Sequence, residues 1–124
     1  IGNHIFEMVD AVAAKEQKKA LDYYYDLLTL KEPPMRILFL ITRHFQILMQ
    51  LREMAGGGFD YKSMASKVGV PEFAVRKYTG QARAFDSLRL EEIMRECVQT
   101  EENIKTGQMG DQLAVELLII STMQ

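Results

Sequence analysis

Apolar residues recur every three or four positions along most of this chain, which is the spacing of amphipathic helices. At the start, Ile5, Val9 and Val12 share one face of a first helix, with Phe6 and Ala13 beside them. No stretch alternates apolar and polar residues over the length of a strand, so strands have little support. The pattern predicts an all-α fold.

A second helix is predicted over residues 16–30, and it contains a run of three tyrosines at 23–25. Consecutive helical residues point about 100° apart, so the three rings cannot all be buried. We expect at least one of them to face solvent or a partner. The buried face is expected to hold Ala20, Tyr24, Leu27 and Leu28.

A third helix is predicted from Pro34 to about residue 55, because proline suits the first helical position. Its polar residues fall in one narrow stripe, and most of the remaining surface is apolar. A helix of this kind is packed on several sides, so we expect it at the centre of the fold. The stripe consists of Arg36, Arg43, Gln46, Gln50 and Glu53.

Four further helices are predicted after the glycines at 56–58. Two short ones occupy residues 60–84, Ser87 is expected to cap a long sixth helix that stops at Gly107, and a last helix starts near Asp111. The chain is therefore expected to be a compact bundle of about seven helices.

Residues 60–84 have the pattern of a helix-turn-helix unit. Asp60 is a suitable N-cap, Pro71 suits the start of the second helix, and Ala65 and Gly69 allow close helix crossing and a tight turn. The segment has five basic and two acidic residues, a net charge of +3. It could read DNA through Arg76 and Lys77, or be a purely structural helix pair. Both interpretations stay open.

Composition narrows the class of protein. The chain has 124 residues, of which 48% are hydrophobic and 26% charged, with a formal net charge of −2. These values argue against disorder and against a globally basic nucleic-acid binder. The longest apolar run, residues 37–41, is far below the roughly 20 residues that span a bilayer. No secretory signal is recognisable, so a soluble, cytoplasmic protein without membrane contact is expected.

Candidate chemical motifs are weak. Gly56 with Lys62 resembles a phosphate loop, but Tyr61 stands where that loop needs glycine. One cysteine and two histidines cannot supply a disulfide or a structural zinc site. His44 is expected to be packed or hydrogen-bonded, and Cys97 to act as a small buried hydrophobe. We therefore predict no catalytic, cofactor-binding or metal-binding residues and no cofactor.

The chain nevertheless contains an ordered set of short motifs that spans nearly its whole length. The motifs lie at residues 6–11 (FEMVDA), 25–28 (YDLL), 32–38 (EPPMRIL), 43–45 (RHF), 65–70 (ASKVGV), 81–85 (QARAF), 104–107 (IKTG) and 113–118 (LAVELL). Each motif is weak alone, but in this order and spacing the set resembles a known family, the C-terminal domain of the delta subunit of the bacterial DNA polymerase III clamp loader.

The resemblance implies that residues 1–124 form a single helical collar domain for oligomerisation. In that family, collar domains of clamp-loader subunits, including delta prime and tau or gamma types, pack into a ring. The sliding clamp and DNA would be contacted only through the full complex. The chain is expected to be a piece of a longer protein, with an N-terminal ATPase-like module outside it. The delta subunit is not thought to hydrolyse ATP, so the resemblance implies no enzyme activity in this piece.

A collar subunit needs lateral surfaces for two neighbours, and such surfaces carry apolar or mixed patches. Surplus aromatic and methionine side chains are the first candidates, and two arginines could form ion pairs or hydrogen bonds across the contact. Ordinary packing within the domain, or solvation, remains the alternative for each. The candidates are Tyr23, Tyr25, Arg43, Phe59, Arg83 and Met109.

Overall fold

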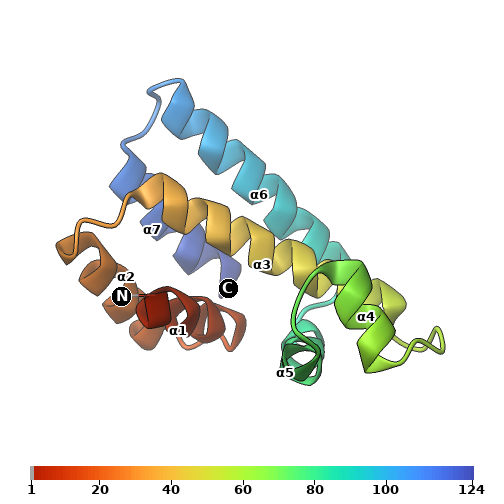
Figure 1. Cartoon of the computed structure of the whole chain (residues 1–124). Coiled ribbons are helices and arrows are strands. Elements are labelled where there is room, and N and C mark those ends of the chain that lie inside the picture. The colour runs from red at the N-terminus through yellow and green to blue at the C-terminus, as the bar shows by residue number, and fades with distance from the viewer. Residues whose placement is uncertain (1) are drawn as a thin grey trace.

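A long central helix, α3 (Pro34–Met54), organises the fold. The structure is a computed structural model that describes residues 2–124, with side chains from His4 onward. Figure 1 shows α3 crossing the molecule, and it packs against α1, α4, α5, α6 and α7. This confirms the central position that its nearly continuous apolar surface predicts. Its buried residues are Ile37, Leu38, Ile41, His44, Phe45, Ile47, Leu48 and Leu51.

Six further helices complete the described chain, and none of residues 2–124 forms a strand. The all-α prediction and the number of helices are confirmed. In chain order the other helices are α1 (Gly2–Ala13), α2 (Gln17–Thr29), α4 (Tyr61–Val68), α5 (Glu72–Ala82), α6 (Ser87–Lys105) and α7 (Asp111–Thr122).

The N-cap of α4 is the predicted residue, whereas the N-cap of α6 lies one residue before the predicted one. Asp60 caps α4, and its carboxylate accepts a hydrogen bond from the Ser63 backbone N–H at 2.8 Å. The expected cap Ser87 is wrong, because Asp86 caps α6 and accepts from the Arg89 N–H at 2.7 Å. Aspartate and serine are both good N-caps. Asp86 is the cap because its carboxylate oxygen reaches the free backbone N–H three residues further along the chain.

Two apolar clusters share α3. The larger cluster joins α1, α2, α6 and α7 to the N-terminal two-thirds of α3, and Tyr24 lies in it with no exposed surface. The Tyr24 hydroxyl donates to the Gln112 carbonyl at 2.6 Å, which ties α2 to α7. The smaller cluster packs α4 and α5 on the C-terminal part of α3 through Ile47, Leu51 and Val75. The α4–α5 pair is thus a separate layer at one end of the central helix (Figure 1).

The turn between α4 and α5 needs glycine. Gly69 ends α4 in the left-handed conformation, with φ of +82°, and its N–H donates to the Ala65 carbonyl at 2.8 Å. Residues other than glycine rarely adopt that backbone conformation. Ala65 and Val75 are buried between the helices, as a helix-turn-helix pattern predicts. The predicted helix pair is therefore present.

Candidate partner interface

The six predicted interface residues come from five separate parts of the chain. Tyr23 and Tyr25 lie on α2, Arg43 on α3 and Phe59 in the α3–α4 loop. Arg83 follows the last residue of α5, and Met109 lies in the α6–α7 loop.

The tyrosine run divides as the helical spacing predicts, with Tyr24 buried and its neighbours on opposite sides. The Tyr23 ring lies 6.0 Å from the His4 ring, and a hydrogen bond to Glu7 raises the pKa of its phenol. Burial, with a smaller contribution from Glu116, raises the pKa of Tyr25. Tyr23 thus faces α1 and Tyr25 faces α7, and only Tyr25 is exposed.

The other four candidates have varied surroundings. Phe59 is half exposed, and the Lys67 ammonium lies 5.5 Å from the centre of its ring. Met109 is half-buried in a hollow of about 200 Å³ between α6 and α7, which Leu117 also lines. Arg83 is exposed, and Arg43 stands at the rim of a larger groove. Their roles stay predictions.

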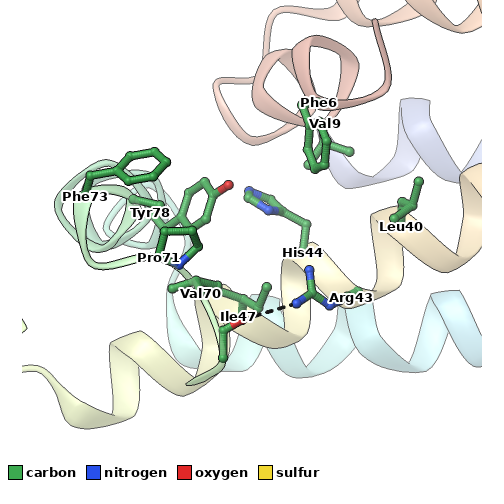
Figure 2. Close-up of a pocket in the computed structure, with 12 residues that line it drawn as sticks. Phe6, Val9, Leu40, Arg43, His44, Ile47, Val70, Pro71, Phe73 and Tyr78 are labelled. Atoms are coloured by element: carbon green, nitrogen blue, oxygen red, sulfur yellow. Dashed lines mark hydrogen bonds between the residues drawn. The ribbon is translucent and has the colours of Figure 1, made fainter. Parts of the chain in front are cut away.

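The groove beside Arg43 is formed by three helices. It has a volume of about 370 Å³, and it lies between α1 and α5 with α3 as its floor (Figure 2). Leu40, His44 and Ile47 of α3 line the floor, and Phe6 and Phe73 stand on the two walls. The α4–α5 turn closes one side. The groove is mainly apolar, with the Arg43 guanidinium at its edge.

The exposure of the aromatic residues that line this groove is not evident from the sequence. Sequence spacing puts Phe6 beside a buried face, but its side chain is 57% exposed, because α5 does not close over it. Phe73, on the opposite wall, is 85% exposed. Phe39 is 63% exposed on α3, although it does not line the groove. A sequence signal existed for Phe39, which lies within the polar stripe of α3 at helical spacing from Arg36 and Arg43.

A polar chain joins the three helices of the groove at one point. Asp10 on α1 accepts hydrogen bonds from Lys77 at 2.5 Å and from the Gln81 side-chain amide at 3.0 Å, both on α5. The Gln81 carbonyl faces His44 Nε2 on α3 at 2.6 Å. Since the Gln81 amide nitrogen donates to Asp10, its oxygen is the acceptor, and His44 carries its proton on Nε2.

His44 is a packed residue, as predicted. Its side chain is buried, and the Tyr78 ring stands edge-on to it with centroids 4.8 Å apart. Burial lowers the pKa of His44, and the hydrogen bond to Gln81 opposes this only in part. The ring is therefore neutral at pH 7. The residues that line the groove around His44 include no serine or cysteine that could act as a nucleophile.

Cys97 and a possible metal site are the remaining candidates for chemistry. Cys97 is buried, and burial raises the pKa of its thiol, which suits a packed residue better than a nucleophile. Over residues 2–124, no three His, Cys, Asp or Glu side chains gather in a way that could hold a metal ion. None of the helices in that range is long and apolar enough to cross a bilayer.

The DNA-reading alternative gains no support from the helix pair. Arg76 is exposed on α5, but Lys77 is engaged by Asp10 of α1. The apolar Phe73, also on α5, is 85% exposed. A helix that reads a groove presents polar side chains to base edges and phosphates. This face instead combines a phenylalanine with an ion pair inside the protein.

Comparisons with known proteins show which family the chain belongs to. It is 30% identical over 121 residues to DNA polymerase III subunit delta of Bacillus subtilis (strain 168), covering 98% of this chain and 35% of that protein. The solved Bacillus subtilis DNA clamp loader delta protein superposes with a TM-score of 0.86 at 30% identity, over 97% of this chain and 35% of that one. The chain thus spans about a third of the length of these relatives. Residues 2–122 match the family model described as the DNA polymerase III delta subunit, C-terminal domain, and the chain belongs to that family.

Proposed function

We propose that this chain is a non-catalytic assembly domain of a clamp-loader delta subunit, through which the subunit packs with other clamp-loader subunits. Its likeness to a clamp loader delta protein supports the proposal. The observation that carries it is that exposed apolar side chains border two separate hollows, one lined by Phe6 and Phe73 and the other by Leu117. Soluble monomers rarely expose large contiguous apolar patches, and a subunit with two neighbours needs two such surfaces.

The first surface surrounds the groove of α1, α3 and α5, and the second lies on α6 and α7. On the second, Leu113 and Leu117 stand one helical turn apart on α7, next to the hollow that contains Met109. Val98 is exposed on α6. Neighbours of the delta prime and tau or gamma types would cover these surfaces.

The remaining functions of the subunit would belong to the part of the protein outside this chain. Residues 1–124 would act as one domain, without cofactor or chemistry of their own. The N-terminal ATPase-like module would reach the sliding clamp, and DNA would be met only through the assembled complex. A subunit of the replication machinery would work in the cytoplasm, where bacterial DNA lies.

A truncation tests this proposal. The full-length subunit, and a version lacking residues 2–122, are each mixed with the other clamp-loader subunits and separated by size-exclusion chromatography. The full subunit should join the complex and the truncated one should elute alone. Binding of the sliding clamp by the truncated subunit serves as the control that it is folded. Assembly that survives the truncation would refute an assembly role for this chain.

A further inference from the structure

The groove of α1, α3 and α5 has a preformed shape. Both walls pack on α3, while α1 and α5 make few contacts with each other, so their separation is not set by mutual apolar packing. The hydrogen bonds from Lys77 and Gln81 to Asp10 fix that separation, and His44 anchors the same chain to the floor. An occupant would find the walls already in place, which lowers the entropy lost on binding.

The walls are unusually apolar for a free surface. Phe73 on one side and Phe6 on the other are largely exposed, and Figure 2 shows them on two different helices, with the floor residue His44 between them in this view. Exposed phenylalanines that flank an apolar hollow are typical of a binding surface, because aromatic side chains dominate the energy of interfaces. An apolar occupant between these walls would bury both rings.

The charge at the rim limits what the occupant can be. The Arg43 guanidinium donates to the Gly69 carbonyl at 3.4 Å, and no described carboxylate pairs with it. In contrast, Arg36 pairs with Glu32 and Lys77 pairs with Asp10. The groove therefore presents one unneutralised cation beside an apolar floor. Its complement is a segment with apolar side chains along one face and a carboxylate at the edge of that face.

The backbone of the groove favours a helix as the occupant. The walls and floor are helices, whose N–H and C=O groups are already paired within each helix. A peptide in the β conformation binds by adding to a sheet edge, and residues 2–124 form no strand. A helix brings its own backbone hydrogen bonds and needs only side-chain contacts, as when an amphipathic helix occupies an apolar groove.

We propose that this groove receives an amphipathic helix of a neighbouring subunit, with its apolar side chains between Phe6 and Phe73 and an acidic side chain paired with Arg43. The inference deepens the proposed function and rests on it. It assigns one of the two assembly surfaces and states the chemistry of the partner element.

Two substitutions in the full-length subunit test the groove, each with a matched control on α4, which belongs to neither proposed assembly surface. Phe73→Ser removes an exposed aromatic wall, and Tyr61→Ser makes a comparable change at an aromatic side chain that is 45% exposed. Arg43→Glu reverses the rim charge, and Lys62→Glu reverses an exposed charge on α4. Affinity for each neighbouring subunit is measured by surface plasmon resonance, and thermal unfolding of each variant is recorded.

For one neighbour, Phe73→Ser and Arg43→Glu should each weaken binding at least tenfold, while the two controls change it less than threefold. A Glu→Lys or Asp→Lys substitution in the docking helix of that neighbour should restore binding to the Arg43→Glu subunit. Restoration by charge exchange would show direct pairing, which a general loss of structure could not produce.

Other outcomes overturn the inference and are distinguishable. If the subunit assembles and Phe73→Ser binds like the wild type, the groove is not an assembly surface, although the proposed function stands. If Phe73→Ser lowers the melting temperature of the free subunit without changing assembly, the rest of the same polypeptide covers the groove. If it abolishes self-association, a second copy is the occupant, and if it abolishes duplex DNA binding, DNA is. Failure of the proposed function itself appears only in the truncation experiment.

Discussion

Replacing Asp10 by alanine tests whether the polar chain between α1 and α5 contributes to stability. The substitution removes acceptors for the Gln81 amide at 3.0 Å and for the Lys77 ammonium at 2.5 Å. A hydrogen bond to a charged group contributes about 1.5–3 kcal/mol, while an ion pair as exposed as this lysine contributes about 0.2–1 kcal/mol. After allowance for the partial exposure of the Asp10 carboxylate, we expect a loss of about 2 kcal/mol.

The matched control is Asp22→Ala, which makes the same chemical change in a solvent-exposed pair. Asp22 accepts from Lys18 at 2.8 Å one turn away on α2, where the side chains are 59% and 91% exposed. Such a pair contributes about 0.5 kcal/mol or less. Both aspartates lie within helices, so the gain in helix propensity on replacement by alanine largely cancels in the comparison.

Urea denaturation followed by circular dichroism measures the difference. With an m-value of about 1.5 kcal/mol/M, Asp10→Ala should lower the midpoint by about 1.3 M, and Asp22→Ala by about 0.3 M or less. A double-mutant cycle should give a larger coupling energy for Asp10 with Gln81 than with Lys77. Equal midpoints for the two variants would refute the reasoning, because the partly buried hydrogen bond between Gln81 and Asp10 would then contribute no more than an exposed ion pair.

Three further predictions concern single groups in the core and turns. Tyr24→Phe removes the hydroxyl that donates to Gln112 and should cost about 1 kcal/mol in urea denaturation. Because burial lowers the pKa of His44 from 6.5, the unfolded chain binds a proton that the folded chain does not. Stability should therefore fall as pH is lowered from 7.5 to 5.5, and thermal melts of His44→Gln should show a weaker fall. Gly80→Ala, in a helix with open space around the new methyl group, should stabilise by about 0.5–1 kcal/mol, whereas Gly69→Ala should destabilise because φ is +82°.

The features that the sequence predicts correctly depend on local periodicity. The apolar circumference of α3 shows that it is central, and the 100° step between helical residues shows that one tyrosine of three is buried. The helix-turn-helix pair follows from Ala65, Gly69 and Val75, which determine how two adjacent helices cross. Each of these conclusions needs only residues close together in the chain.

The features that it does not predict depend on contacts between distant segments. Asp10 and Gln81 are 71 residues apart, and His44 is 37 residues from Gln81, so no local pattern connects them. The exposure of Phe6 depends in the same way on α5, which leaves a groove above α1 instead of covering it. Sequence spacing places Phe6 at the edge of a face, but only the tertiary arrangement decides whether that edge is buried.

The same arrangement connects the stability of the groove to its proposed occupancy. Asp10 does not line the groove, yet it fixes the position of α5, and with it Phe73, relative to α1. Asp10→Ala should therefore weaken binding of the neighbouring subunit in the same direction as Phe73→Ser, although it removes no contact with the partner. Once Phe73 is absent, the position of its wall matters less, so the double variant should lose less binding free energy than the sum of the single losses. Surface plasmon resonance on the four subunits measures this, and strictly additive losses would show that Asp10 and Phe73 act independently.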